Sequence, residues 1–346
     1  MPKLISIYSG CGGLDLGFKK AGFETILATD NWKIACETLS SNKLSKNVIC
    51  DDIRKINFKP YKKEKIDCLI GGPPCPPYSQ TRHYLTQKNN GLKDEKSGFT
   101  LTEYFRVLKE TNPKVFLFEN VDGFLHKLHF EELKFLEETS KLLGYDITYK
   151  VVNCANYGIP QTRKRFICVG WKSNLKAFEF PKETHKELKL ISKDKNNKYK
   201  PWVTAGDVLN DIDIDLPEDK NQRAGSKDKD LLPLIPPGDN YLFFTEKKGH
   251  PNPLFKWKSR YWTFLLKLSP SRPSWTIQAS FSNNQGPFHW KNRFLRINEL
   301  KRIQTFDDNY KLNGSFQEQW RQIGNAVPPK LAYIFAKEII KQYFTE

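Results

Sequence analysis

The sequence predicts an α/β fold built on a doubly wound, mostly parallel sheet, with a second, smaller region inserted before the C-terminal segment. Two observations support this prediction. Short apolar runs rich in β-branched residues alternate with helical stretches through residues 3–121, and this alternation is typical of parallel sheets with helices on both faces. After about residue 172 the chain becomes richer in Lys, Asp and Asn, which indicates a region of different organisation.

The expected strands and helices follow in chain order. Five apolar runs predict strands at residues 4–9, 26–30, 48–52, 66–71 and 115–119. Helical periodicity between these runs predicts helices at residues 14–21, 32–39 and 101–110. We also expect a strand at residues 166–170 and a final helix at residues 330–343, which would pack back onto the first region.

This organisation predicts two domains. Residues 1–172 together with residues 305–346 would form the first domain, and residues 173–304 would form the second. Within the second domain, residues 185–200 and 217–230 contain few apolar side chains. Such composition cannot bury much apolar surface, so it predicts surface loops.

The charge of the chain restricts the classes of partner. The 346 residues have a formal net charge of +17. This excess fits a merely Lys-rich composition, or a polyanionic partner whose phosphates Lys and Arg would neutralise, with nucleic acid slightly favoured. No apolar run approaches the roughly 20 residues of a membrane span, and the first residues have no signal-peptide layout. We therefore expect a cytoplasmic protein that is not attached to a membrane.

The seven cysteines are scattered along the chain. No pair has CxxC spacing, and no pair of His residues accompanies them at zinc-finger spacing. His126 and His129 lie three residues apart without further ligands. We expect no metal site and mostly buried thiols, among which one can still be a nucleophile.

A glycine cluster, SGCGGLD at residues 9–15, follows the first predicted strand and opens the first predicted helix. The GxG pattern alone also occurs in nicotinamide and flavin enzymes. A dinucleotide site would have a third glycine near position 15, where the helix N-terminus meets a pyrophosphate, and Asp15 would repel that group. The acid and the nearby Phe18 fit a ligand with a sulfonium and a free amino group better.

Two acids end the next predicted strands. Asp30 follows Gly10 at the spacing at which a carboxylate accepts ribose hydroxyls. Asp52 and Ile53 could accept the amino group of an adenine and flank its ring. Each acid could instead cap the following helix. Their occurrence as a set favours the cofactor interpretation.

The run GGPPCPPYS at residues 71–79 places Cys75 between prolines. Because prolines restrict the backbone on both sides, the thiol would be presented rigidly at a strand end, as a nucleophile requires. A proline-rich turn with an incidental cysteine is the alternative. Glu119 ends the next strand, where burial would raise its pKa and let it share a proton with a bound base. Arg163 and Arg165 could hold a thiolate, a phosphate or a carbonyl oxygen, or form an ordinary basic patch.

Taken in order, these motifs resemble the DNA cytosine-5 methyltransferase family of bacterial restriction-modification systems. The order is GxGG, an acid, Asp-Ile, Pro-Cys, Glu-Asn-Val, QTRKR at residues 161–165 and QIGNAVPP at residues 322–329. RPSWTI at residues 272–277 resembles a further block of that family. The resemblance covers residues 3–172 and about 270–342, and the residues between match only in position, where the family keeps its target-recognition region.

The resemblance implies the fold of S-adenosylmethionine-dependent methyltransferases and a role for each motif. Cys75 would attack carbon 6 of a cytosine flipped out of the duplex, with Glu119 as the acid at ring nitrogen 3. Arg165 would bind the cytosine carbonyl oxygen, and Arg163 would support Cys75 or a flanking phosphate. Residues 80–98 would form a closing lid. The residues implied to line the cofactor site are Ser9, Gly10, Gly12, Gly13, Phe18, Asp30, Asp52, Ile53, Pro74, Leu101, Asn325 and Ala326.

The resemblance also implies the reaction partners. The cofactor would be S-adenosyl-L-methionine, the product S-adenosyl-L-homocysteine and the substrate double-stranded DNA. A functionally paired restriction endonuclease and a monomeric enzyme are further expectations. Pro76 and Tyr78 depart from the Gln and Phe that are usual in the family.

Three other functions fit part of the pattern. A transfer-RNA methyltransferase of the same fold would carry a Cys-Phe-Thr signature, which this sequence lacks. An inactive, DNA-binding paralogue would tend to lose the Pro-Cys or the Glu-Asn-Val motif, and this chain has both. A nucleotide-dependent oxidoreductase is a poor fit to Asp15 and to the Pro-Cys pair.

Overall fold

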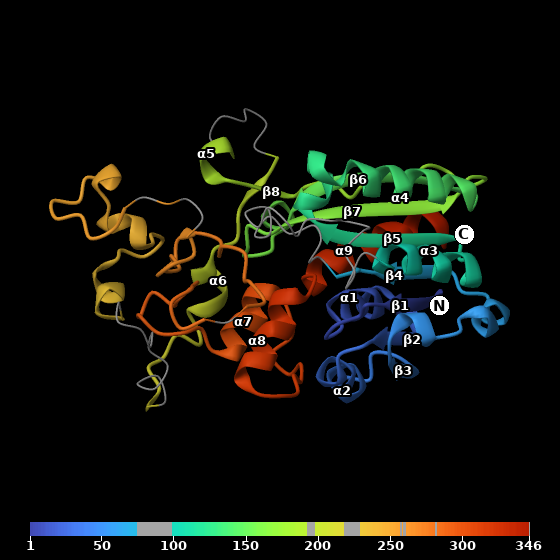
Figure 1. Cartoon of the computed structure of the whole chain (residues 1–346), viewed down its shortest axis with the longest axis horizontal. Helices are drawn as coiled ribbons and strands as arrows, with labels where there is room; N and C mark the ends of the chain where they lie inside the picture. The colour runs from blue at the N-terminus through green and yellow to red at the C-terminus, as the bar shows by residue number, and fades with distance from the viewer. Residues whose placement is uncertain are drawn as a thin grey trace.

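A seven-stranded sheet is the central element of the part of the chain that the structure describes (Figure 1). The structure is a computed structural model, and it describes residues 1–74, 99–191, 198–217, 229–256, 258, 261–280 and 282–345. In spatial order the strands are β3 (Asn47–Cys50), β2 (Glu24–Asp30), β1 (Lys3–Ile7), β4 (Cys68–Gly71), β5 (Val115–Val121), β7 (Lys164–Lys172) and β6 (Tyr145–Asn153). The pairs among β1 to β5 are parallel, and β7 is antiparallel to both of its neighbours.

The antiparallel strand β7 brings a basic motif to the edge of the sheet where the parallel strands end. A short turn, Cys154–Tyr157, precedes β7, so the chain returns beside β6 rather than crossing over the sheet. Arg165 at the start of β7 pairs with Val121 at the end of β5 and with Val152 near the end of β6. The QTRKR motif therefore lies at the carboxyl ends of β5 and β6.

Strand residues alternate between two hydrophobic clusters, one on each face of the sheet. Leu4 and Leu117 belong to the cluster that α1 and α9 cover, whereas Ile5 and Phe116 belong to the cluster that α3 covers. In Figure 1, α3 and α4 lie in front of the sheet and α9 lies behind it. The helices of this region are α1 (Gly13–Ala21), α2 (Lys33–Ser41), α3 (Phe99–Thr111), α4 (Phe130–Leu142) and α9 (Pro329–Tyr343).

Three helices beside the sheet share a third cluster. They are α6 (Ala205–Leu209), α7 (Ile297–Gln304) and α8 (Phe316–Asn325). The expected domain boundary between residues 304 and 305 therefore passes through one shared core. Phe178 packs into the core of the sheet region, beyond the other expected boundary at residue 172. The division into two domains stays a proposal.

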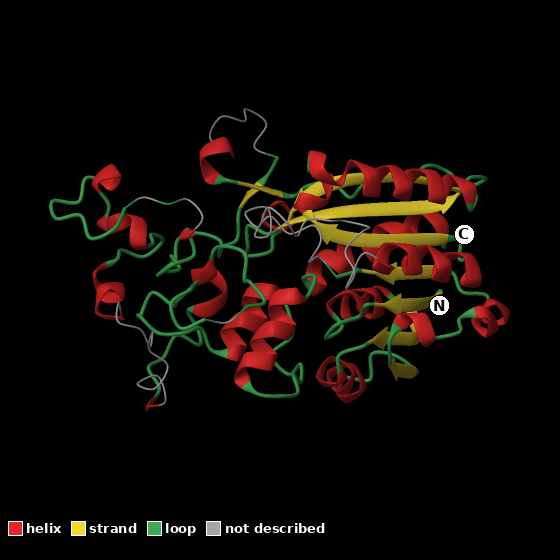
Figure 2. Cartoon of the chain, viewed as in Figure 1, coloured by secondary structure: helices red, strands yellow, loops and turns green. Residues whose placement is uncertain are grey.

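The outer part of the second region consists mainly of loops (Figure 2). In the stretches where surface loops are predicted, the described residues also form β8 (His185–Lys186), α5 (Leu188–Ile191) and β9 (Lys200–Pro201). The short 3-10 helices within the described residues are η1 (Ile53–Lys55), η2 (Lys59–Glu64), η5 (Asp122–Leu125), η6 (Lys127–His129), η7 (Cys154–Tyr157), η9 (Lys229–Leu234), η10 (Tyr241–Phe244) and η11 (Glu246–Lys248). Residues 192–197 and 218–228 lie outside the described part.

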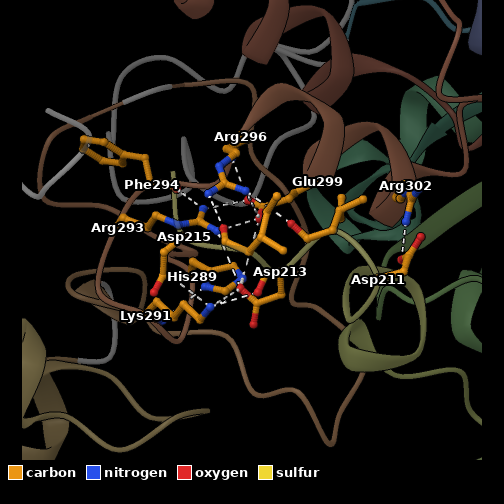
Figure 3. Close-up of polar contacts among 12 residues, drawn as sticks. Asp211, Asp213, Asp215, His289, Lys291, Arg293, Phe294, Arg296, Glu299 and Arg302 are labelled. Atoms are coloured by element: carbon orange, nitrogen blue, oxygen red, sulfur yellow. Dashed lines mark hydrogen bonds and ion pairs between the residues drawn. The ribbon is translucent and has the colours of Figure 1, made fainter. Parts of the chain in front are cut away.

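A buried charge network fixes the start of α7 (Figure 3). Glu299 accepts hydrogen bonds from both terminal nitrogens of Arg293, at 2.9 and 2.7 Å, and from the backbone amide of Arg296 at 2.8 Å. His289 lies between two acids, with Nε2 3.5 Å from Asp213 and 3.7 Å from Glu299. The network joins the segment after α6 to the segment that enters α7.

The structure confirms the predicted fold class and most of the predicted elements. All six expected strands and the four expected helices are present, with ends shifted by a few residues. Strand β6 and helix α4 of the sheet region were not predicted, nor were the elements between residues 173 and 328, namely β8, α5, β9, α6, α7 and α8. No helix in the described ranges is both long enough and apolar enough to cross a membrane.

Candidate active site

The carboxyl ends of the parallel strands bring the predicted site residues to one edge of the sheet. Asp30 ends β2, Gly71 ends β4 and Glu119 lies near the end of β5. The glycine cluster follows β1 at the same edge. Because ligands of doubly wound sheets bind beyond these strand ends, this edge is the candidate active site.

An ion pair between Glu119 and Arg165 lies at the centre of this edge. Arg165 Nε is 2.8 Å from Glu119 Oε1, and each side chain is at most 10% exposed. Burial raises the pKa of Glu119, whereas the charges of Arg165 and Arg163 act to lower it. The carboxyl group therefore holds a proton to higher pH than an exposed glutamate does.

The segment that leads to Cys75 passes directly over this carboxylate. A Cβ on Gly72 would lie 2.6 Å from Glu119 Oε2, so a larger residue there would have to displace this carboxylate. The side-chain amide of Asn120 donates a 3.4 Å hydrogen bond to the carbonyl of Pro73. The Glu-Asn pair of the motif thus touches the chain two and three residues before Cys75. Cys75 itself and the predicted lid, residues 80–98, lie outside the described residues.

Arg163 is directed inward rather than toward the open edge. It is 1% exposed and donates to the backbone carbonyls of Ile277, Gly324 and Ala326 at 2.8 to 3.1 Å. A guanidinium so enclosed does not reach a phosphate of a bound duplex, which corrects one of its two expected roles. Its contacts join the start of β7 to α8, and its positive charge acts to lower the pKa of Glu119.

Asp30 is fixed between two backbone amides. Its Oδ2 accepts a 2.8 Å hydrogen bond from Gly10 N, and its Oδ1 accepts a 2.9 Å bond from Trp32 N. Burial raises the pKa of Asp30, and these backbone hydrogen bonds oppose the shift. The carboxylate is thereby tied to the glycine loop at the edge of the sheet, where it could accept ligand hydroxyls.

The glycine loop is packed tightly on one side and open on the other. A Cβ on Gly13 would lie 2.2 Å from the carbonyl oxygen of Val327, so this residue must be glycine for the C-terminal segment to pack there. Gly10 and Gly12 have φ of 54° and 82°, and no heavy atom lies within 4 Å of the position of a Cβ on Gly10. Ser9 is buried, and its hydroxyl lies 2.8 Å from that of Ser6.

Phe18 is not in a position to line this site. Its ring is fully buried in the core between the sheet and α9 and packs against Phe23 at a centroid distance of 5.0 Å. The expectation that Phe18 touches the cofactor is therefore wrong: it lies on the face of α1 that is directed into the core. The aromatic residue at the strand end is Tyr8, which sequence reasoning missed. Tyr8 is half-buried and donates to the carbonyl of Thr100 at 2.9 Å.

Asp52 caps a short helix, which was the alternative interpretation of this acid. It accepts hydrogen bonds from the backbone and the side chain of Arg54 at 3.0 and 2.9 Å. These bonds lower the pKa of Asp52 to about 2. Ile53 and Leu101 are buried in the same core cluster, and Pro74 is exposed at the end of the described segment.

The QIGNAVPP motif ends α8 beside the glycine loop. The thiol of Cys11 donates to the carbonyl of Gln322 at 3.3 Å. Asn325 is exposed at the end of α8, where its side chain is available to a ligand. Ala326 is buried, and its carbonyl accepts hydrogen bonds from Arg163 and Gln304.

Trp32 is a further residue at this edge that sequence reasoning missed. It follows Asp30 by two positions, is half-buried and begins α2 as its N-cap. The guanidinium of Arg321 lies 4.6 Å from the centroid of its ring. An aromatic residue two positions after an acid at a strand end was the available signal, but its contact with α8 could not be read from the sequence.

The described cysteines differ in accessibility. Cys50 is exposed, and the others, including Cys154, are buried. Burial raises the pKa of Cys154 to about 11, although Arg165 and Arg163 act to lower it. A fully buried thiol with a raised pKa is a poor nucleophile, so Cys154 does not compete with Cys75 for that role.

The open side of the glycine loop has the character of a ligand site. Asp15 is fully buried, and neither of its carboxyl oxygens makes a hydrogen bond of standard geometry within the described part of the chain. Burial raises the pKa of Asp15 to about 7, against the lowering effect of the Ser6 hydroxyl. Together with the free space at Gly10 and the carboxylate of Asp30, these groups fit a ligand with ribose hydroxyls and an amino group. Within the described ranges no cluster of three or more His, Cys, Asp or Glu residues could hold a metal ion.

Comparisons with known proteins agree with this geometry. The family model of the C-5 cytosine-specific DNA methylases matches residues 2–341. The type II methyltransferase M.SacI of Streptomyces achromogenes is 35% identical over 98% of this chain and 93% of its own length. M.NgoFVII of Neisseria gonorrhoeae is 33% identical over 98% of this chain and 86% of its own.

Solved structures share the fold at lower identity. A prophage-encoded protein of Escherichia coli superposes with a TM-score of 0.70, 21% identity and 99% coverage of both chains. A DNMT2 mutant of Spodoptera frugiperda superposes with a TM-score of 0.68 and 17% identity over 98% of this chain and 100% of its own. At these identities the likeness concerns the fold alone.

Proposed function

The chain belongs to the C-5 cytosine-specific DNA methylases, and from this membership we propose a specific mechanism. The enzyme transfers a methyl group from S-adenosyl-L-methionine to carbon 5 of a cytosine within a specific duplex DNA sequence. The cytosine is flipped out of the duplex, and Cys75 forms a transient covalent bond to its carbon 6. Unstacking of the base costs a few kcal/mol.

One observation carries the proposal: the buried Glu119–Arg165 pair lies beneath the segment that leads to Cys75. A carboxyl group whose pKa is raised by burial can donate a proton to ring nitrogen 3. A guanidinium beside it can donate to the neighbouring carbonyl oxygen. A cytosine offers these two acceptors side by side, so the pair is complementary to its polar edge.

The proposed steps balance in atoms and electrons. The thiolate of Cys75 bonds to carbon 6 while Glu119 gives its proton to nitrogen 3, which directs ring electrons to carbon 5. When bound, the cofactor supplies an electrophilic methyl group for carbon 5. A solvent water then takes the proton from carbon 5, the electrons of that bond re-form the ring double bond, and the bond between Cys75 and carbon 6 breaks with its electron pair returning to the sulfur as a thiolate. The proton on nitrogen 3 returns to Glu119, so the enzyme is restored.

The same edge would hold the cofactor. Asp30 would accept the ribose hydroxyls, Gly10 leaves room for the ligand, and Asn325 is exposed beside the glycine loop. Ser9, Gly12, Gly13, Asp52, Ile53, Pro74, Leu101 and Ala326 remain proposed members of this site. The product would be S-adenosyl-L-homocysteine.

The second region would read the DNA sequence. The net charge of +17 favours a duplex substrate. We further propose that the enzyme acts as a monomer in the cytoplasm and is paired functionally with a restriction endonuclease. Residues 173–304 would supply the side chains that reach the bases.

A trapping experiment tests the mechanism. Fluorine on carbon 5 cannot leave as a cation, so a duplex with 5-fluorocytosine at the methylated site should stay bonded to the protein in the presence of S-adenosylmethionine. The adduct should survive denaturing electrophoresis and map to Cys75. Cys75→Ser should abolish it, whereas the matched control Cys50→Ser, at the exposed cysteine, should not. A methylating enzyme that gives no adduct, or methyl transfer to bulk tRNA rather than to duplex DNA, would contradict the proposal.

A further inference from the structure

Trp32 and Arg321 meet at the cofactor edge from opposite ends of the chain. The guanidinium carbon of Arg321 is 4.6 Å from the centroid of the Trp32 ring. A cation at this distance over an indole face is attracted by the negative potential of the ring, and tryptophan is the aromatic side chain that interacts most strongly in this way. The contact therefore holds the indole in one orientation.

The backbone of Trp32 is hydrogen-bonded to the carboxylate of Asp30. The amide of Trp32 donates a 2.9 Å hydrogen bond to Asp30 Oδ1, and the amide of Gly10 donates to the other carboxyl oxygen. The carboxylate expected to receive the ribose and the indole next to it thus form one unit, fixed on the glycine loop. Any ligand bound through Asp30 has Trp32 beside it.

Arg321 is placed by α8, and among the residues that the structure describes no other group competes for its guanidinium. Its neighbour Gln322 accepts a hydrogen bond from the thiol of Cys11 in the glycine loop, and Trp320 donates from its indole nitrogen to the carbonyl of Gln278. The helix is therefore anchored on both sides of Arg321. Within the described ranges the guanidinium has neither a carboxylate in ion-pair range nor a hydrogen bond, so the indole is its contact. An exposed arginine without such a contact would keep its rotamer freedom.

The charge of Arg321 also reaches the acid. It acts to lower the pKa of Asp30, in the same direction as the backbone hydrogen bonds and against the effect of burial. The effect of Arg321 on the pKa of Asp30 agrees with its 4.6 Å distance from the Trp32 ring, because both indicate a guanidinium close to Asp30 and Trp32.

We propose that Arg321 is a positioning residue of the cofactor site: it fixes the Trp32 indole beside Asp30, so that the adenine ring of the cofactor meets an aromatic surface already in place. The inference rests on the proposed function, because it takes the ligand of this edge to be S-adenosylmethionine. It adds a residue of α8 that touches neither the reacting atoms nor the ribose acid. The mechanism is preorganisation, which strengthens binding by reducing the ordering that binding requires.

A double-mutant cycle tests the proposal by titration of the full chain with S-adenosyl-L-homocysteine. Arg321→Met keeps the aliphatic length and removes the charge, and it should weaken binding by about two- to fivefold, the effect of one exposed cation–π contact. Arg321→Lys should retain most of the affinity. In a Trp32→Leu background the Arg321→Met change should have little further effect, because the ring through which it acts is gone. The Michaelis constant for S-adenosylmethionine should rise with an unchanged turnover number.

Lys33→Met is the matched control, since it removes one exposed positive charge next to Trp32. It should leave the affinity unchanged. Equal losses from Arg321→Met in both backgrounds, or no loss in either, would overturn the positioning role. A wild-type chain that binds no S-adenosyl-L-homocysteine, although it is folded, would instead overturn the proposed function and this inference with it.

Discussion

At the residue scale, we propose Glu119 as the proton donor, and its neutral analogue tests that role. Glu119→Gln keeps the size and polarity of the side chain but cannot transfer a proton. Turnover on duplex DNA should fall by about 10²- to 10⁴-fold, the range of general acid–base catalysis. Glu138→Gln, at an exposed residue of α4, is the control and should leave turnover on duplex DNA unchanged. A Glu119→Gln enzyme within a few-fold of wild type would remove the acid from the mechanism.

The pH dependence of Glu119 follows from its burial. Because burial raises its pKa, the proton that the mechanism uses is present below the folded pKa and is lost as the pH rises through it. The turnover rate should therefore fall along an alkaline limb that reports this group. The limb should disappear in Glu119→Gln, which titrates no carboxyl group there.

Asp15 makes a separate prediction about stability and pH. Burial raises its pKa from 3.8 to about 7. The fold thus favours the protonated acid, whose contribution to stability is complete below pH 3.8 and is lost as the pH rises toward 7. Between pH 5 and pH 8 the wild-type free energy of unfolding should decline more than that of Asp15→Asn. The difference should be at most about 3 kcal/mol, because about two pH units of this window lie below the folded pKa and each is equivalent to about 1.4 kcal/mol.

Urea unfolding at the two pH values measures this difference. Asp146→Asn, at an exposed position in β6, supplies the control because the other ionisable groups are unchanged in both variants. Parallel declines in wild type and Asp15→Asn would show that the buried acid is solvated or paired at both pH values.

At the element scale, α7 and α8 both begin with a glutamate at N3 that accepts from the backbone of the N-cap residue, but the two glutamates differ in burial. The N3 residues are Glu299 in α7 and Glu318 in α8, and each accepts from the backbone of its N-cap residue. Glu299 is fully buried and paired with Arg293, as Figure 3 shows, whereas Glu318 caps an exposed helix start. The cap is common to both helices and the buried charge is specific to α7.

Substitution by glutamine separates these two contributions. Glutamine also serves in a capping box, so Glu318→Gln should change the free energy of unfolding by less than about 0.5 kcal/mol. Glu299→Gln removes the nearest counter-charge of the buried Arg293 and leaves only Asp213, at 3.9 Å, so it should destabilise the protein by up to about 3–5 kcal/mol. Chemical denaturation of both variants measures the contrast. Equal losses would mean that the Arg293–Glu299 pair contributes nothing beyond the cap.

A strand or helix could be predicted from the sequence where a local pattern of apolar residues marks it. Strands β1, β2, β4 and β5 are buried on both faces and read as continuous apolar runs. Strand β6 lies at the edge of the sheet, and its mixed, half-exposed residues give no such run. Apolar patterns therefore predicted the interior strands and the edge strand β3 but missed β6, the edge strand at the other side of the sheet.

The site could be predicted as a set of residues but not as contacts. Glu119 and Arg165 were both expected at the active edge, yet their ion pair depends on the insertion of β7 between β5 and β6, which no local pattern specifies. The side on which Phe18 faces depends on where α9 packs against α1. Arg321 and Trp32 meet only because α8 ends beside the glycine loop.

At the scale of the whole molecule, the excess of basic residues predicts the response of DNA binding to salt. The chain has 56 Lys and Arg residues against 39 Asp and Glu residues. If the enzyme contacts six or more phosphates, its affinity for a duplex should fall by roughly 10³ or more between 50 and 200 mM salt. Fluorescence anisotropy with a labelled duplex measures the slope, and S-adenosyl-L-homocysteine binding, which involves no phosphate, serves as control. A flat response would show that the charge is compositional.

The packing of α9 on α1 also determines how late in translation the glycine loop can reach its folded arrangement. Gly13 of the glycine loop lies against the carbonyl of Val327, and α9 covers the apolar face of α1. Ribosomes add about 5–20 residues per second, so the roughly 300 residues between the two helices take about 15 to 60 seconds to synthesise. During that interval the nascent chain carries its glycine loop without the support beneath it. We therefore expect the glycine loop to gain its support only after α9 has been synthesised, and a chain that ends before α9 to leave the apolar face of α1 uncovered.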